Sequence, residues 1–385
     1  MTTIFGIETP ELKQSGSFWT ASEIQQQPGK WREAAKVVHE CRAQLKEFLD
    51  PFFAKENARV VFTGAGTSAF VGEVLEPALK LRTGKRFDSV SSTDIVSSPE
   101  EFLGEQVPTL LVSFARSGNS PESLAAVQLA DQVLNECYHL IVTCNPEGEL
   151  CLGKKNDSKS FCLVMPEGTN DNGFAMTSSF SCMLLSALCI FSAEENSLEM
   201  AETVATYTEA LLENKFELAR ELTQQPMERL VFLGSGPMRG LAREASLKFL
   251  ELTAGSVVSL HDSPLGFRHG PKSVINDKTM VVQFMATEAY TRLYDQDLQN
   301  ELKTNGIARE LVALDVLDRE EGSVLSGLPE LDADSMWLCF PYIAFAQMMA
   351  FFKSYSMGKG VDNPFPGGEV NRVVEGVIIH PFANS

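Results

Sequence analysis

Basic residues are scarce in this sequence. Its 385 residues include 32 Lys and Arg against 51 Asp and Glu, which gives a formal charge of −19. Nucleic acids and anionic membrane surfaces are held by clustered Lys and Arg, so the acid excess argues against both as partners. The charge favours solubility and does not indicate a fold.

Two kinds of signal are missing as well. None of the eight cysteines forms a Cys-x-x-Cys pair, so neither a zinc knuckle nor a thioredoxin-type site is predicted. Residues 1–14 lack the basic region and apolar run of a signal peptide, so we expect a cytoplasmic protein with reduced thiols. The longest apolar stretch, Met336–Phe352, contains Pro341 and Gln347 and predicts a buried strand and helix rather than a membrane span.

What the sequence does contain is an internal repeat. Hydrophobic residues make up 44% and charged residues 22%, which is ordinary globular composition, and the length predicts two domains. The segment Arg59-Val-Val-Phe-Thr-Gly-Ala-Gly66 reappears as Arg229-Leu-Val-Phe-Leu-Gly-Ser-Gly236. Each copy is an apolar run that ends in Gly-x-Gly and precedes a helical pattern, so strand, tight turn and helix are predicted twice.

Strands and helices are predicted to alternate in both halves, which indicates an α/β fold with parallel sheets flanked by helices. We expect a helical segment at 1–50, a first domain at 51–198, a connecting helix at 199–226 and a second domain at 227–385. The predicted strands are Thr109–Phe114, Tyr138–Cys144, Ser160–Met165, Thr279–Phe284, Glu310–Leu314 and Trp337–Phe340, and the predicted helices include Thr177–Ser192 and Glu199–Leu222.

Two strand-to-helix turns are rich in groups that bind phosphate. Gly64-Ala-Gly66-Thr67-Ser68 offers backbone N–H groups and hydroxyls. Ser113-Phe-Ala-Arg116-Ser117-Gly-Asn-Ser120 adds a cation and two hydroxyls before a helix that starts at Pro121. Each alone is compatible with an ordinary capped turn, with Arg116 in solvent. Together they predict one pocket for a phosphomonoester.

A dinucleotide site is the competing interpretation. Gly64-x-Gly66-x-x-Ala69 approximates the Rossmann fingerprint, and Asp88 lies near the required distance. The second repeat, Gly234-x-Gly236-x-x-x-Gly240, does not fit that pattern. We therefore favour the phosphomonoester over a dehydrogenase.

Candidates for proton transfer lie in the second half. Glu244, Lys248 and Glu251 have i, i+4 and i+7 spacing on a helix with apolar neighbours, so a partly buried carboxylate could serve as a general base. The alternative is an ion pair on a solvated face. His269, in the loop Phe267-Arg-His-Gly-Pro271, could move a proton, as histidine side chains do in many enzymes, or could make only one backbone hydrogen bond. It lacks neighbouring ligands, so no metal is predicted.

This ordered set of motifs, from about Asp50 to the end, resembles the tandem SIS (sugar isomerase) domain proteins, whose domains are three-layer α/β/α and flavodoxin-like. By resemblance to the isomerase domain of glucosamine-6-phosphate synthase, Ser68, Ser117 and Ser120 bind the sugar phosphate, within turns that also hold Gly66, Thr67 and Arg116. By the same resemblance, Glu251 is the base that moves a proton between C2 and C1 of the sugar, and Lys248 belongs to the active-site helix. His269 assists ring opening and reaches in from the neighbouring subunit. That relative has Ser and Gln where this chain has Ala115 and Arg116, and a C-terminal lysine where the nearest basic residue here is Arg372.

A narrower resemblance lies in three further segments. Phe174–Ser179, Asp262–Lys272 and Val370–Pro381 are similar to the D-galactosamine-6-phosphate deaminase/isomerase family, also labelled tagatose-6-phosphate ketose/aldose isomerases. The resemblance implies a homo-oligomeric enzyme of N-acetylgalactosamine catabolism that needs no cofactor and forms tagatose 6-phosphate and ammonia. Two alternatives stay open: an isomerase without deamination, and a non-catalytic sugar-phosphate-binding regulator. DNA-binding regulators of this kind carry a basic helix-turn-helix domain, which this sequence lacks.

Overall fold

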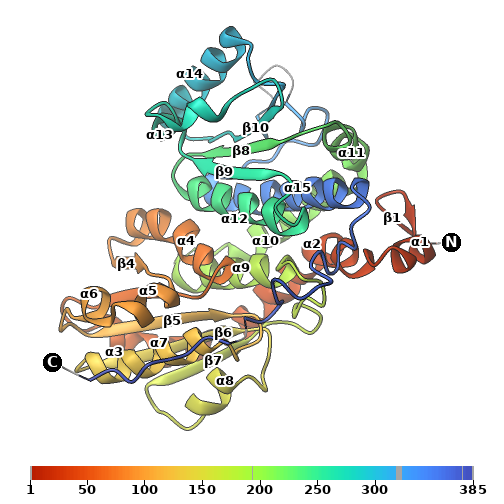
Figure 1. Cartoon of the computed structure of the whole chain (residues 1–385). Coiled ribbons are helices and arrows are strands. Elements are labelled where there is room, and N and C mark those ends of the chain that lie inside the picture. The colour runs from red at the N-terminus through yellow and green to blue at the C-terminus, as the bar shows by residue number, and fades with distance from the viewer. Residues whose placement is uncertain (1, 193, 318–322, 375, 384–385) are drawn as a thin grey trace. The chain divides into compact units, whose positions relative to one another are not determined.

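The computed structural model describes residues 2–192, 194–317, 323–374 and 376–383, and it divides the chain into two compact units (Figure 1). The five-stranded unit holds Lys30–Asp171, Ser178–Leu198 and Gly368–Ser385. The four-stranded unit holds Met1–Gly29, Asn172–Thr177 and Glu199–Gly367. The chain therefore passes between the units several times, and the tail from Gly368 belongs with the five-stranded sheet.

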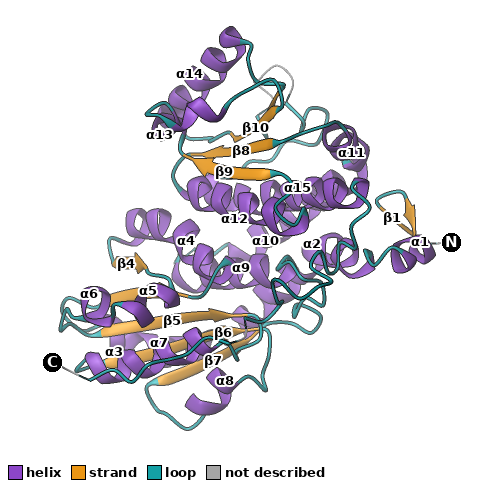
Figure 2. Ribbon diagram, viewed as in Figure 1, coloured by secondary structure: helices purple, strands orange, loops and turns teal. Residues whose placement is uncertain are grey.

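The five-stranded unit is built on one parallel sheet (Figure 2). Across the sheet, the strands are β4 (Arg86–Ser89), β3 (Arg59–Thr63), β5 (Thr109–Ala115), β6 (Cys137–Thr143) and β7 (Ser160–Val164). In chain order this is 2-1-3-4-5, the flavodoxin-like arrangement. Every residue of β3 and β5 is buried, as expected of central strands that are covered on both faces.

Helices cover both faces of this sheet. Val61, Leu111 and Ile141 pack with helices α5 (Ser92–Ser97), α6 (Pro99–Leu103), α7 (Pro121–Val133) and α8 (Glu149–Lys154). On the other face, Phe62 contacts Phe191 with ring centroids 5.5 Å apart. Phe191 ends α9 (Ser178–Phe191), which packs on α4 (Thr67–Thr83), and α3 (Arg42–Phe53) packs on β7. This confirms the three-layer α/β/α class.

The four-stranded unit repeats the same topology. Its parallel sheet has the order β11 (Glu310–Leu314), β10 (Thr279–Phe284), β8 (Arg229–Gly234) and β9 (Val258–Asp262). The C-terminal part of the unit also contains α10 (Ser197–Asn214), α11 (Phe216–Gln224), α12 (Pro237–Leu252), α13 (Pro264–Phe267), the 3₁₀ turn η1 (Pro271–Val274), α14 (Ala289–Asn305) and α15 (Ser335–Ser356). The N-terminal part adds β1 (Thr3–Ile4), β2 (Ile7–Glu8), α1 (Thr9–Gln14) and the first residues of α2 (Phe18–Glu40).

Helix α15 forms the centre of the four-stranded unit. This helix of 22 residues is long enough and, over an 18-residue window, apolar enough to cross a membrane, but that window is entirely buried within the structure. The predicted strand at Trp337–Phe340 is wrong, because these residues lie in α15, which Asp334 caps by accepting hydrogen bonds from the backbone N–H groups of Met336 and Trp337. A helix that is buried on all sides has no polar face, so its sequence reads like a buried strand.

Three other expectations need correction. The predicted helix Glu199–Leu222 is two helices, α10 and α11, with a break at Lys215. Strands β4 and β9 were not predicted; both are edge strands with mostly exposed or half-exposed residues, so their apolar signal is weak. Cys151 and Cys162 form a disulfide between α8 and β7, where reduced thiols were expected. That pairing is a tertiary contact which sequence spacing does not reveal.

Candidate active site

The turn after β3 depends on two glycines. A Cβ atom on Gly64 would lie 2.6 Å from the backbone and Cβ of Ser68, and Gly66 has a φ of +56°, which other residues rarely adopt. This geometry brings the chain directly from β3 into the N-terminus of α4. Gly66 is the N-cap residue, and Thr67 and Ser68 are buried in the first turn of the helix. The N–H groups of that turn therefore lie at the carboxyl edge of the sheet, as predicted.

The turn after β5 is held by the loop that precedes α8. Gly118 has a φ of +70°. The Asn145 side chain donates to the Ser117 carbonyl at 2.8 Å, and the Asn119 side chain accepts from the Glu149 backbone N–H at 2.9 Å. Helix α7 starts at Pro121 as predicted, but the Ser120 hydroxyl donates to the Ser123 hydroxyl at 2.7 Å and makes no capping hydrogen bond. The turn is thus fixed by its neighbours, and the Ser120 side chain does not cap the N-terminus of α7.

Both turns lie at the topological switch point of the sheet. Strands β3 and β5 are neighbours, but the chain leaves β3 for β4 on one side and leaves β5 for β6 on the other. In open α/β sheets, ligands bind in the crevice that this divergence opens. The structure therefore brings together the predicted residues of the two turns, which are Gly66, Thr67, Ser68, Arg116, Ser117 and Ser120.

Three further hydroxyls lie beside these turns: Ser113 belongs to the second predicted motif, whereas Thr63 and Ser92 were not selected from the sequence. Thr63 and Ser113 face each other in the register of β3 and β5, and Ser92 donates its backbone N–H to the Gly64 carbonyl. The side-chain oxygens of all three are buried and have no hydrogen-bond partner among the described residues. Buried hydroxyls normally find a partner, so these polar atoms beside two helix N-termini suit a bound anion. A hydroxyl residue at the end of an apolar strand is the sequence signal that could have identified Thr63.

Arg116 is not a solvent-exposed cation. Only 7% of its surface is exposed, and its guanidinium donates to the Arg372 carbonyl at 2.8 Å. The Arg372 side chain in turn donates to the Asp171 carbonyl. The carboxylate of Asp171 accepts from the backbone N–H groups of Ser178 and Ser179, at 3.0 Å each, at the start of α9. Arg372 therefore fastens the C-terminal tail beside the turn that follows β5.

In the four-stranded unit, α12 buries a charged triplet. Lys248 is 1% exposed, and its Nζ lies 2.7 Å from Glu251 Oε2 and 3.4 Å from Glu244 Oε1. Glu244 is fully buried, whereas 24% of the Glu251 side chain is exposed. The alternative of an ion pair on a solvated face is therefore wrong. One ammonium group neutralises two carboxylates in part, and only Glu251 combines this support with access to solvent.

His269 lies on an exposed loop that two ion pairs anchor. Its neighbours Arg268 and Lys272 both bind the carboxylate of Glu301 on α14, Arg268 at 2.7 Å. Gly270 has a φ of +118°, which permits the tight turn after the histidine. The His269 backbone N–H donates to the Gly266 carbonyl at 2.9 Å, and the imidazole has no hydrogen-bond partner among the described residues. The loop thus presents a free imidazole on a fixed backbone.

The second Gly-x-Gly turn differs from the first. After β8, the Ser235 hydroxyl donates to Asp295 Oδ1 at 2.7 Å, and the Ala286 N–H donates to Asp295 Oδ2 at 2.9 Å. Ala286 follows β10, the strand beside β8, so Asp295 lies at the switch point of this sheet. The repeat therefore carries a carboxylate of its own at the position where an anion would bind.

Two other kinds of site find no support among the described residues. Asp88 accepts from Arg59 Nε at 2.6 Å, so the carboxylate that a dinucleotide ribose would need is already engaged. Asp131, Cys137 and His139 lie close enough together to hold a metal ion. However, Lys154 Nζ is 2.6 Å from Asp131, and burial raises the pKa of the Cys137 thiol to about 12. A neighbouring ammonium and a protonated thiol do not form a metal site.

Comparison with known proteins identifies the family. The SIS domain model matches residues 52–193. A D-galactosamine-6-phosphate deaminase AgaS from Shewanella sp. (strain ANA-3) is 45% identical, over 98% of this chain and 95% of its own length. A protein of the same name from Escherichia coli is 42% identical, over 97% of this chain and 98% of its own length. The crystal structure of a tagatose-6-phosphate ketose/aldose isomerase from Escherichia coli superposes with a TM-score of 0.87 at 41% identity and covers 95% of this chain and 97% of its own. With these motifs and this fold, the chain belongs to the family of SIS-domain proteins named D-galactosamine-6-phosphate deaminase AgaS.

Proposed function

We propose that this chain is an enzyme that converts D-galactosamine 6-phosphate and water into tagatose 6-phosphate and ammonia. The names of relatives at 42% and 45% identity support the substrate and the reaction. The observation that carries the proposal is the triplet of Glu244, Lys248 and Glu251 on α12. Its partly exposed carboxylate, Glu251, lies 2.7 Å from the buried ammonium group of Lys248, which holds it in place. A regulator that only binds sugar phosphates would have no use for such a charged group at a solvent-accessible position.

The substrate phosphate is proposed to bind at the two turns of the five-stranded unit. Backbone N–H groups of α4 and α7 and the hydroxyls of Thr67, Ser68, Ser117 and Ser120 would surround its oxygens. The helix N-termini and Arg116 supply positive potential for a dianion in a chain whose overall charge is −19. Fixing the phosphate orients the remainder of the sugar, which contributes to rate by positioning.

The chemical steps follow from one base and one mobile proton. His269 protonates the ring oxygen or removes the anomeric hydroxyl proton, so that the pyranose opens to an aldehyde. Glu251 then removes the proton from C2 and returns it to C1, through an enolamine, to give an imine at C2. Water adds to C2, ammonia leaves, and the ketose remains. General base catalysis of this kind contributes typically about 10²–10⁴-fold.

An isomerase without deamination is the second candidate. The Escherichia coli structure similar to this chain is titled a tagatose-6-phosphate ketose/aldose isomerase. Such a reaction also moves a proton between C2 and C1 and would use the same base. The two candidates differ in whether nitrogen leaves the substrate.

The test is ammonia release from galactosamine 6-phosphate, measured beside glucosamine 6-phosphate and tagatose 6-phosphate. Ammonia from the galacto sugar is the expected result, and Glu251→Gln should lower turnover by about 100-fold or more. Glu221→Gln is the matched control, because Glu221 is exposed on α11 of the same unit and should leave turnover unchanged. Interconversion of tagatose and galactose 6-phosphates without ammonia would favour the isomerase, and near-normal turnover by Glu251→Gln would contradict the assignment of the base.

We also propose that the active form is a dimer or larger homo-oligomer in which His269 serves a neighbouring subunit. The exposure of His269 and its unpartnered imidazole are compatible with such a role. Mixing inactive Glu251→Gln and His269→Asn chains tests this, since hybrid dimers would regain one intact site in two. Recovery of about one quarter of wild-type activity is expected, and no recovery from exchanged subunits would contradict action between subunits.

A further inference from the structure

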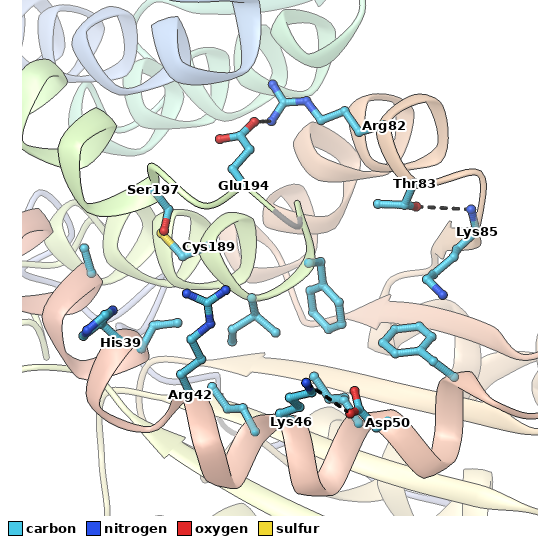
Figure 3. A pocket seen from close by; sticks show the side chains of 17 residues that line it. His39, Arg42, Lys46, Asp50, Arg82, Thr83, Lys85, Cys189, Glu194 and Ser197 are labelled. Atoms are coloured by element: carbon cyan, nitrogen blue, oxygen red, sulfur yellow. Dashed lines mark hydrogen bonds and ion pairs between the residues drawn. The ribbon is translucent and has the colours of Figure 1, made fainter.

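The five-stranded unit contains a pocket that the proposed reaction does not use. Its volume is about 660 Å³, within the usual range of small-molecule sites, roughly 300–1,000 Å³. It lies where the end of α2, the length of α3 and the C-terminal ends of α4 and α9 meet (Figure 3). The phosphate-binding turn lies at the other end of α4, and a helix of 17 residues spans about 25 Å.

The pocket is cationic in an acidic chain. Among its described lining residues, four are Lys or Arg and two are acidic, whereas the whole chain carries −19. Glu194 pairs with Arg82, so that pair is neutral. Asp50 is 4.0 Å from Lys46 Nζ, and both side chains are more than 60% exposed, so this contact is weak.

Arg42 and Lys85 carry charge that the pocket leaves available. Arg42 points from α3 into the pocket and has no ion-pair partner among the described residues (Figure 3). Arg42 is also the first residue of α3, where the helix dipole disfavours a cation. Stabilisation of its own helix therefore does not account for an arginine at this position. Lys85 has only the ring of Phe53 below its ammonium group, 4.3 Å from the ring centroid.

Apolar side chains form much of the remaining wall, beside the polar residues His39, Thr83 and Ser197. They include Leu45, Leu49 and Phe53 from α3, and Ile190 and Phe191 from the end of α9. Aliphatic and aromatic walls with a few cations at the rim fit a ligand that has an apolar body and an anionic group. An inorganic ion would leave the walls uncovered, and a neutral apolar molecule would leave Arg42 and Lys85 unpaired.

We propose that this pocket is a second binding site, separate from the phosphate-binding turns, for a small organic anion such as an aryl or alkyl carboxylate, sulfonate or phosphate. Arg42 lies at the N-terminal end of α3 and Lys85 lies beside Phe53 at its C-terminal end, so each cation can bind an anionic group at its own end of the pocket. The apolar side chains of α3 and α9 between them enclose the body of the ligand. The site belongs to the five-stranded unit alone, so it does not depend on the proposed reaction.

The probe for the test is 8-anilinonaphthalene-1-sulfonate, an aryl sulfonate whose fluorescence rises in apolar surroundings. The full-length protein should bind it saturably, with one such site per chain and an affinity that falls with added salt. The double variant Arg42→Ala/Lys85→Ala should raise the Kd about tenfold or more. Lys36→Ala removes one charge from an exposed residue of α2 outside the pocket and should leave the Kd unchanged.

Two further arms separate this site from others. N-phenyl-1-naphthylamine, the neutral analogue, should bind the wild type and the double variant equally. Glu251→Gln should bind the sulfonate like the wild type, and galactosamine 6-phosphate should not displace it. Absence of saturable binding, an unchanged Kd in the double variant, or displacement by the sugar phosphate would overturn the proposal.

Discussion

Replacing Lys248 by Met should strongly destabilise the protein. The ammonium lies 2.7 Å from a Glu251 oxygen and 3.4 Å from a Glu244 oxygen, and it is 1% exposed. At an effective dielectric constant of about 20, the two attractions amount to about 6 and 5 kcal/mol before desolvation is subtracted. Removing one member of a buried ion pair costs about 3–5 kcal/mol, because the remaining charge stays buried without compensation.

A control variant and a double variant test this prediction. Lys36 pairs with Glu40 at 3.7 Å on an exposed helix face, so Lys36→Met should cost less than about 1 kcal/mol. Adding Glu244→Gln to Lys248→Met removes the fully buried carboxylate and should recover at least about 1 kcal/mol. The free energies of unfolding come from urea denaturation followed by circular dichroism. The reasoning fails if Lys248→Met costs no more than Lys36→Met, or if the double variant is less stable than Lys248→Met.

Three further predictions concern Asp295, Glu301 and Arg116. Burial raises the pKa of Asp295 to about 6, so the folded state binds a proton more tightly than the unfolded state does. The protonated Asp295 contributes fully to the free energy of unfolding below about pH 4, and this contribution falls by about 3 kcal/mol as the pH rises to 6. Asp295→Asn should lack this fall when the free energy of unfolding is measured by urea denaturation at several pH values. The same pH dependence in both proteins would contradict the prediction. Glu301→Gln should lower the free energy of unfolding by less than about 1 kcal/mol. It should lower kcat about tenfold with little change in KM, because Arg268 and Lys272 no longer fix the His269 loop. An unchanged kcat would show that the loop needs no anchor. Arg116→Ala should raise the KM for the sugar phosphate about tenfold or more. Arg86→Ala, which removes one member of an exposed ion pair, should leave that KM unchanged. Equal KM values for the two variants would show that Arg116 does not contribute to phosphate recognition.

The sequence predicted those features that depend on local patterns. Strands Thr279–Phe284 and Glu310–Leu314 lie where they were expected, and α7 begins at Pro121. The two turns that we propose to bind phosphate were predicted because a glycine turn, hydroxyls and a helix start are close in sequence. The same is true of the triplet on α12, whose i, i+4 and i+7 spacing fixes a shared face.

Features that depend on tertiary contacts were missed. Thr63 was not selected, because its position beside Ser113 depends on β3 and β5 being neighbours, which the sequence does not state. Asp295 lies at the second Gly-x-Gly turn although 60 residues separate it from Ser235. The contact of Arg116 with Arg372 joins positions 256 residues apart. The strand prediction for Trp337–Phe340 was wrong because these residues are buried on all sides, and a short apolar run does not distinguish a central helix from a central strand.

The most direct test of the proposed reaction follows both products, tagatose 6-phosphate by NMR and ammonium by an enzyme-coupled assay. Wild-type protein with galactosamine 6-phosphate should yield one ammonium ion per tagatose 6-phosphate. Glu251→Gln should form neither product at a comparable rate. Conversion of the sugar without ammonium, or full turnover by Glu251→Gln, would contradict a deaminase that works through this carboxylate.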